Sequence, residues 1–329
     1  MKTNNVLKIG PGVIDDISNT LVSSNIKGKL LYVSDPVVDN LYGDTVINQF
    51  KEIGIVKEEH VDYNTIAYSM SVAERVIATD IDCIIGLGGG KVLDVCKYAA
   101  HISKKPFLSI PTTMANDGIC SPIAVLKRQD NKPKSLGCKM PSMLLLDTEL
   151  ILKGPEALIK AGIGDTISNY SALLDWKFAC DRNKDEMNGY AFMMSKNSLD
   201  ALMKTQYNSI GSDFIEVLAN SLVLSGVAMD FAGSSRPVSG SEHLFSHALD
   251  YYCKEHNLHG IQVALGTVAM LMLINEDYSD VVNYLKKFQV DINPRNLKID
   301  EETFVYCIQN ASSMRTNRYT YLDEIDLNG

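Results

Sequence analysis

Short runs of β-forming residues alternate with segments of helical apolar spacing through the first half of the chain. Each run is apolar and is bounded by turn residues, which is typical of a buried strand. Strands that alternate with helices form βαβ units, so this half predicts a mainly parallel sheet whose ligands bind beyond the carboxyl ends of its strands. The expected strands are residues 30–35, 83–87, 107–110 and 143–146, and the expected helices are residues 44–53 and 66–79.

A triple glycine follows the second of these strands. The sequence GLGGGKVLDVCKYAA places Gly88, Gly89 and Gly90 between a strand and the start of a helix. There, backbone N–H groups and the helix dipole can hold a pyrophosphate, and glycine allows its close approach. A structural turn is the alternative reading, because Lys91 stands where GxGxxG would require its last glycine. The position between strand and helix favours the phosphate. Asp94 either faces the same ligand or is an ordinary first-turn carboxylate.

Two further carboxylates follow predicted strands. Asp35 ends the first strand, where it can accept a hydrogen bond from the 2′-hydroxyl of an adenosine ribose, which would favour NAD over NADP. It can equally initiate the turn at Asp35-Pro36. Asp117 lies in the polar loop PTTMANDG after the third strand, and we interpret it as a substrate contact. The alternative is that this loop is only a connector.

The pattern changes near Leu152, after which apolar residues recur at helical spacing almost throughout. We therefore expect two domains, residues 1–151 and 152–329. The net charge of -9 argues against nucleic acid or an anionic membrane surface as a partner. Residues 1–10 lack the apolar core of a signal peptide, and the run 261–274 is too short to span a bilayer, so a cytoplasmic protein without membrane insertion is expected. The seven cysteines form no paired motif.

Four of the six histidines lie between His243 and His259. His243 and His247 stand four residues apart in a helical pattern, so their rings project from one helix face. A catalytic zinc typically takes three protein ligands, so two histidines and one carboxylate would suffice. Asp165, just before a predicted helix, could supply that carboxylate or could simply cap the helix. Because HExxH is absent, histidines satisfied within a core are the competing interpretation.

Five motifs occur in order along the chain. They are GLGGGKVLDVCK, PTTMANDGICSP, AGIGDTISNYSALLDWK, SSRPVSGSEHLFSHALD and LHG, with RTNRYTYL near the end. Together they resemble the iron-containing alcohol dehydrogenase superfamily, and most closely its sn-glycerol-1-phosphate dehydrogenase branch. The resemblance implies a dehydroquinate-synthase-like fold: an N-terminal α/β dinucleotide-binding domain with a parallel sheet and an all-α C-terminal domain. Substrate and metal would lie in the cleft between them.

The resemblance also implies roles for single residues. The metal ligands would be Asp165, His243 and His259, and His247 would lie near the nicotinamide and assist proton transfer. Asn169 stands where iron-dependent relatives carry a further histidine, which favours zinc, with iron or nickel as other candidates. The remaining matches are Gly88, Gly89 and Gly90 to the pyrophosphate loop, Thr112 and Thr113 to neighbouring cofactor contacts, and Asp117 to a carboxylate beside the substrate.

The substrate is expected to be phosphorylated. Arg236 and its neighbour Ser239 match a feature of the glycerol-phosphate branch, and a guanidinium offers a bidentate fork to phosphate. The chain departs from the branch by carrying Met114, Ala115 and Asn116 where histidine usually precedes the Asp-Gly pair.

The activity implied is reversible reduction of dihydroxyacetone phosphate with NAD or NADP as cofactor, in phospholipid metabolism, by a homo-oligomer. The alternatives are a glycerol dehydrogenase acting on the free polyol, a carbocyclase that eliminates phosphate, and a noncatalytic homologue.

Overall fold

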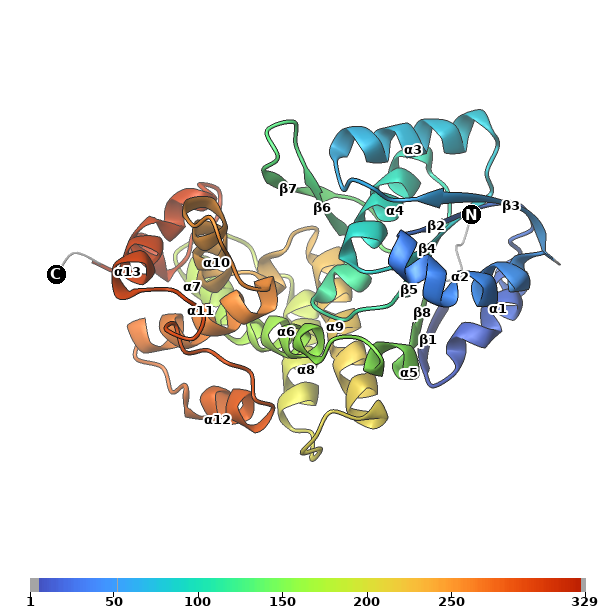
Figure 1. Ribbon diagram of the computed structural model, residues 1–329. Coiled ribbons are helices and arrows are strands. Elements are labelled where there is room, and N and C mark those ends of the chain that lie inside the picture. The colour runs from blue at the N-terminus through green and yellow to red at the C-terminus, as the bar shows by residue number, and fades with distance from the viewer. Residues whose placement is uncertain (1–5, 52, 327–329) are drawn as a thin grey trace. The chain divides into compact units, whose positions relative to one another are not determined.

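The computed structural model describes residues 6–51 and 53–326 of the chain. The chain divides into two compact units, of which Figure 1 colours the first from blue to green and the second mainly from green to red. The expected boundary after residue 151 falls within the short helix α5 (Thr148–Leu152), whereas the division follows Pro155. Unit 1 comprises Met1–Met114 and Gly118–Pro155, and unit 2 comprises Ala115–Asp117 and Glu156–Gly329.

Unit 1 contains a six-stranded sheet in which every neighbouring pair of strands is parallel. The strand order is β1-β8-β5-β4-β2-β3, so β1 and β3 form the edges. The predicted mainly parallel sheet is confirmed. Two further strands, β6 and β7, form a separate antiparallel hairpin. The strands are β1 (Val6–Gly10), β2 (Gly28–Ser34), β3 (Gly54–His60), β4 (Cys83–Gly88), β5 (Phe107–Pro111), β6 (Ile123–Lys127), β7 (Pro133–Gly137) and β8 (Met143–Asp147).

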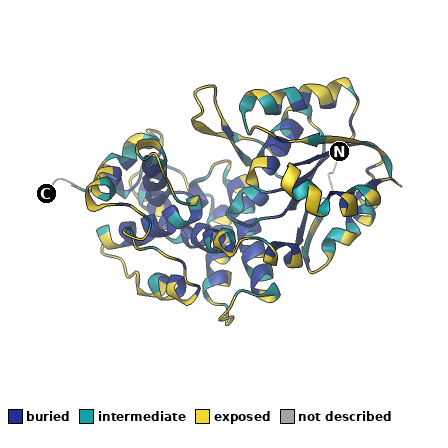
Figure 2. Cartoon of the chain, viewed as in Figure 1, coloured by how far each residue is buried: buried dark blue, intermediate teal, exposed yellow. Residues whose placement is uncertain are grey.

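Alternate residues of the central strands enter one core with two of the helices. Leu30 of β2 and Ile85 of β4 lie in the same buried cluster as Leu21 of α1 (Ile17–Ser23) and Phe50 of α2 (Pro36–Phe50). The intervening residues, such as Ile84, are buried as well, so β4 and β5 are buried along their whole length (Figure 2). A sheet covered on both faces has strands that read as continuous apolar runs. The other helices of unit 1 are α1 (Ile17–Ser23), α2 (Pro36–Phe50), α3 (Ile66–Ala78) and α4 (Gly90–Ser103).

The secondary-structure elements of unit 2 in its described residues are all helices, as predicted. Its longest helix, α9, is apolar and long enough by composition to cross a membrane, but 61% of its apolar window is buried inside the molecule. It therefore has the burial of a core helix. The helices are α6 (Glu156–Ile167), α7 (Asn169–Asp181), α8 (Gly189–Met203), α9 (Ser212–Ala232), α10 (Ser241–Tyr252), α11 (His259–Leu273), α12 (Ser279–Lys287) and α13 (Glu301–Asn310), with the 3-10 turns η3 (Arg236–Val238), η4 (Ala311–Met314) and η5 (Tyr321–Asp323).

Candidate functional site

Three side chains with metal-ligating atoms converge in unit 2. Asp165 comes from α6, His243 from the first turn of α10, and His259 is the first residue of α11. One donor atom from each lies within 4.8 Å of the other two. Nε2 of His259 is 3.8 Å from Oδ1 of Asp165, and the two imidazole centroids are 4.9 Å apart. The structure thus brings together the two histidines and the carboxylate singled out from the sequence.

A close crossing of α6 and α11 sets the spacing of two of these residues. Gly164 precedes Asp165 and Gly260 follows His259, and each glycine faces the backbone of the opposite helix. A Cβ on Gly164 would overlap the carbonyl oxygen of Gly260, and a Cβ on Gly260 would overlap the carbonyl oxygen of Ala161. The absence of side chains at these two positions therefore allows the two main chains to touch.

A buried carboxylate orients His243. Oε1 of Glu242 lies 2.7 Å from Nδ1 of His243, and the Glu242 side chain is fully buried. This carboxylate also accepts hydrogen bonds from the backbone N–H of Gly240 at 2.7 Å and from the Ser171 hydroxyl at 2.8 Å. Because Nδ1 is engaged, Nε2 is the nitrogen available to bind a metal. A hydrogen bond from the other ring nitrogen to a carboxylate is usual for a metal-ligating histidine.

His259 is held in a comparable way by a hydroxyl. Its Nδ1 lies 3.1 Å from Oγ of Ser246, which accepts a hydrogen bond from Nε2 of Gln262 at 2.9 Å. The same amide nitrogen donates to Oδ1 of Asp250 at 3.0 Å. Both candidate ligand histidines therefore have Nδ1 bound to protein and Nε2 available.

Burial sets the protonation states at this cluster. It lowers the pKa of His243 and of His259 to about 3, so both rings are neutral near pH 7 and can bind a metal. Burial, followed by the charge of Asp117, raises the pKa of Asp165 well above its usual range. A bound cation would reverse that effect by favouring the carboxylate.

Asp117 and His247 lie beside this cluster. The backbone N–H of Asp117 donates to Oδ2 of Asp165 at 3.0 Å. The His247 ring centroid is 6.5 Å from that of His243 and 6.3 Å from that of His259, so His247 is a neighbour of the three candidate ligands. Asn169, which stands where the resemblance placed a further histidine in iron-dependent relatives, donates from Nδ2 to the Ser225 hydroxyl at 2.9 Å.

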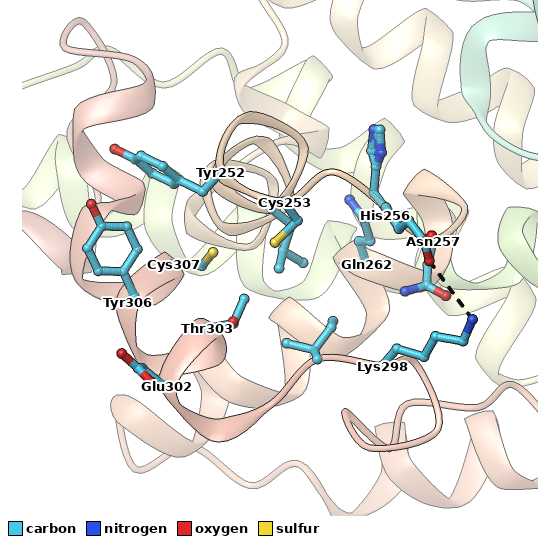
Figure 3. Close-up of a pocket in the computed structure, with 13 residues that line it drawn as sticks. Tyr252, Cys253, His256, Asn257, Gln262, Lys298, Glu302, Thr303, Tyr306 and Cys307 are labelled. Carbon is cyan, nitrogen blue, oxygen red and sulfur yellow. Dashed lines mark ion pairs between the residues drawn. The ribbon is translucent and has the colours of Figure 1, made fainter.

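The fourth histidine of the sequence cluster lies elsewhere in unit 2. His256 lines a cavity of about 490 Å³ formed by the end of α10, the start of α11 and α13. Figure 3 shows it near Asn257 and Lys298, with Tyr252 and Tyr306 at the other end of the cavity. None of the three candidate metal ligands lines this cavity.

In unit 1, the glycine turn joins β4 to α4. Gly88 ends the strand, Gly89 caps the helix and Gly90 begins it. All three glycines have φ outside the left-handed region. The choice of glycine at these positions therefore reflects the close approach of other atoms, not a left-handed turn conformation. A Cβ on Gly88 would press on Val92, whereas no atom lies within 4 Å of the Cβ position on Gly90. The open space is beside the helix N-terminus, where a phosphate would bind.

The two threonines predicted as cofactor contacts lie against this turn. The backbone N–H of Thr112 donates to the carbonyl of Gly88 at 3.0 Å. Oγ1 of Thr113 lies 3.1 Å from the position of a Cβ on Gly89. The structure therefore joins the loop after β5 to the glycine turn.

Two carboxylates expected to contact the cofactor are hydrogen-bonded within unit 1. Oδ2 of Asp94 accepts from the backbone N–H of Val125 at 3.1 Å, and Oδ1 faces the buried ammonium of Lys97 at 3.4 Å. Asp94 therefore balances a buried charge inside unit 1, and we do not propose a cofactor contact for it. Oδ1 of Asp35 accepts from the N–H groups of Val37 and Val38, so Asp35 caps α2, which was its alternative reading.

The two residues expected to contact the substrate phosphate, Arg236 and Ser239, are also hydrogen-bonded within the protein. Nε of Arg236 forms an ion pair with Asp185, and its Nη1 donates to the carbonyl of Tyr319 at 2.8 Å. The carbonyl of Ser239 accepts from Nη1 of Arg318. Both residues have structural partners that lie far away in sequence. The sequence patterns indicate no role for Arg318, which lies in the motif RTNRYTYL.

We expect Gly90→Ala to lower the affinity for NADH without lowering the free energy of unfolding. The new methyl group meets no protein atom and occupies a helical position, where alanine is favoured by up to about 1 kcal/mol over glycine. The affinity for NADH should fall at least about tenfold, as for one lost hydrogen bond to a charged group. Fluorescence titration with NADH and urea unfolding measure the two quantities. Gly137→Ala, which also meets open space, is the control, and unchanged NADH affinity in Gly90→Ala would contradict a phosphate site at this turn.

We expect Glu242→Gln to weaken metal binding by about 10- to 100-fold, as is typical for an outer contact of a ligand histidine. The substitution preserves size but replaces the carboxyl acceptor next to Nδ1 of His243 with an amide. Competition with a chromophoric chelator measures the zinc affinity. The exposed Glu255→Gln is the matched control, with a side chain that is 88% exposed. Equal affinities in the two variants would show that Glu242 does not support the ligand.

Comparison with known proteins places these features in context. Residues 8–155 match the model of a family described as iron-containing alcohol dehydrogenase. The glycerol-1-phosphate dehydrogenase [NAD(P)+] of Sulfurisphaera tokodaii is 35% identical over 320 residues, covering 96% of this chain and 90% of that protein. The enzyme of the same name from Methanosarcina barkeri is 32% identical over 318 residues, covering 95% and 89%.

Solved structures share the fold at lower sequence identity. A probable glycerol dehydrogenase from Sinorhizobium meliloti superposes with a TM-score of 0.79 at 18% identity, covering 98% of this chain and 93% of that chain. A sulfoacetaldehyde reductase from Bifidobacterium kashiwanohense, solved in complex with NAD+, gives a TM-score of 0.73 at 14% identity, covering 99% and 94%. At these identities the similarity extends to the fold alone.

Proposed function

The chain belongs to the iron-containing alcohol dehydrogenase family, and on that premise we propose that it reversibly reduces dihydroxyacetone phosphate to sn-glycerol 1-phosphate with NADH or NADPH. The observation that carries the proposal is the convergence of Asp165, His243 and His259 in a chain with near full-length similarity to glycerol-1-phosphate dehydrogenases. A homo-oligomeric assembly and a cytoplasmic location are part of the same proposal.

We propose that Asp165, His243 and His259 hold a divalent metal, most simply zinc. Two neutral imidazoles and one carboxylate are a donor set that zinc accepts with a fourth position open for substrate. The bonds of both Nδ1 atoms to protein support this assignment, because they aim Nε2 inward. When bound, the metal supplies Lewis-acid polarisation of the substrate carbonyl, and the nicotinamide supplies the hydride.

We propose that His247 moves the proton and that Asp117 orients the substrate. Burial, followed by the charge of His259, lowers the pKa of His247 well below its usual range, so its ring is neutral near pH 7. A neutral imidazole can accept the hydroxyl proton of the alcohol during oxidation and return it during reduction. The Asp117 carboxylate, whose own backbone N–H binds Asp165, can accept a hydrogen bond from a substrate hydroxyl.

We propose that the glycine turn of unit 1 holds the pyrophosphate of the nucleotide. The N-terminus of α4 and the open space beside Gly90 support this role, with Thr112 and Thr113 against the same turn. The backbone N–H groups of the first helical turn would then donate to phosphate oxygens. Asp35, through its second oxygen, remains our candidate for the adenosine ribose.

The decisive experiment is a spectrophotometric assay of NADH and NADPH oxidation by purified, metal-analysed protein. We expect a far higher kcat/KM for dihydroxyacetone phosphate than for dihydroxyacetone. Equal values would contradict the proposal and favour a polyol dehydrogenase. Release of inorganic phosphate without net consumption of NADH would instead identify a carbocyclase.

A further inference from the structure

Two arginine side chains from the C-terminal segment of unit 2 meet at one serine. Oγ of Ser235 accepts a hydrogen bond from Nη2 of Arg318 at 2.8 Å and lies 3.4 Å from Nη1 of Arg315. The second terminal nitrogen of Arg318, Nη1, donates to the carbonyl of Ser239. Arg318 is only 9% exposed, and Arg315 is partly exposed. Two guanidinium groups are therefore fixed side by side, one beneath the surface and one partly open to it.

The charge of Arg318 is not directly balanced. Arg318 donates hydrogen bonds to the neutral oxygens of Ser235 and Ser239, and it forms no ion pair within the described residues, whereas Arg236 is paired with Asp185. Burial lowers the pKa of Arg318 to about 9, and the charges of Arg315 and Arg236 act in the same direction. A buried cation beside like charges is costly unless an anion joins it.

Two buried carboxylates near Arg318 have other partners. Oδ2 of Asp175 accepts from the N–H and hydroxyl of Ser241, and Oε1 of Glu242 accepts from the N–H of Gly240. These bonds hold both carboxylates at the start of α10. Their charges act on Arg318 from a distance, without a direct ion pair, so they do not take the place of a bound anion.

Arg318 binds the chain just before α10, the helix that carries His243. Ser239, whose carbonyl accepts from Arg318, lies four residues before His243 in the sequence and two before the start of α10. Arg315 follows η4, whose Ala311 packs in the same core cluster as Leu244 and Phe245 of α10.

We propose that Arg315 and Arg318, with the hydroxyl of Ser235, form the subsite for the phosphate group of a phosphate monoester substrate. This inference rests on the proposed function and assigns its substrate specificity to these residues in place of Arg236. Two adjacent guanidinium groups offer several parallel N–H donors to phosphate oxygens, which suits a dianion far better than a neutral hydroxyl.

The test compares the phosphate ester with the free triose. In Arg315→Met and Arg318→Lys, the ratio of kcat/KM for dihydroxyacetone phosphate to that for dihydroxyacetone should fall about 10- to 100-fold, as for the loss of hydrogen bonds to a charged group. Arg236→Lys, which preserves the ion pair with Asp185, is the matched control and should keep the wild-type ratio. Arg315→Lys, which keeps the charge but removes the fork, provides a second measurement if either of the other variants is poorly folded by circular dichroism.

Phosphite provides a test that does not need the ester. In a protein with a phosphate subsite, added phosphite should accelerate reduction of dihydroxyacetone, and Arg315→Met should reduce this acceleration at least about tenfold. A wild-type protein without preference for the ester would contradict the proposed function itself. A wild-type preference that Arg315→Met and Arg318→Lys retain, but Arg236→Lys loses, would overturn the arginine pair while leaving the function intact.

Discussion

His243→Ala and His259→Ala are each expected to abolish turnover, with a fall in kcat of at least about 10³-fold, because Lewis-acid stabilisation contributes several kcal/mol to such reactions. Each substitution removes one of the three donors that lie within 4.8 Å of one another. The purified variants should also contain almost no metal by atomic emission. Their affinity for NADH should change little, because the glycine turn lies in unit 1 and the histidines in unit 2.

His256→Ala is the matched control for these variants. It comes from the same cluster in the sequence, but it is exposed and lines the separate cavity shown in Figure 3. Its metal content and kcat should equal those of the wild-type protein. Near-normal turnover and full metal content in either His243→Ala or His259→Ala would refute the assignment of the ligands.

Gly260→Ala and Gly164→Ala are each expected to lower both the free energy of unfolding and the affinity for metal. Each new methyl group would overlap a carbonyl of the facing helix, and backbone atoms cannot move aside as a flexible side chain can. We expect the free energy of unfolding to fall by about 3 kcal/mol or more, at the upper end for overpacked cores. Separation of α6 from α11 should also lower metal affinity, since Asp165 and His259 lie directly beside the two glycines.

Urea unfolding and zinc competition measure the two effects. Gly189→Ala is the control, because no atom lies within 4 Å of its Cβ position and it also begins a helix. Its stability should be unchanged or slightly higher. If Gly260→Ala unfolded at the same urea concentration as the wild-type protein, the close crossing would not set the geometry of the site.

The sequence predicted the centre of the sheet but missed its edges. The four expected strands correspond to β2, β4, β5 and β8, which are interior strands. The two strands of this sheet that were missed, β1 and β3, are its edges, and β3 contains the charged sequence GIVKEEH. The separate hairpin of β6 and β7 was missed as well. An interior parallel strand is buried on both faces and is a continuous apolar run, whereas an edge strand often carries charges that discourage aggregation.

The candidate site was predictable where the information was local. Spacing placed His243 and His247 on one helix face, and motifs supplied Asp165 and His259. Contacts with distant residues were not visible: nothing near Arg236 in the sequence indicates its ion pair with Asp185 or the pairing of Arg318 with Ser235. Glu242 stands next to His243, but sequence alone cannot distinguish a fully buried carboxylate from a solvated one.

The crossing of α6 and α11 divides the candidate metal site into a part fixed by the main chain and a part set by side chains. Main chain meets main chain between Gly164 and Gly260, so no side chain there can be exchanged to widen or narrow the gap between Asp165 and His259. His243 comes from a third helix and rests on the Glu242 side chain. If the three residues bind a metal, substitutions that change its preferred ion should therefore act through α10, because the spacing of the other two candidate ligands is fixed by the main chain.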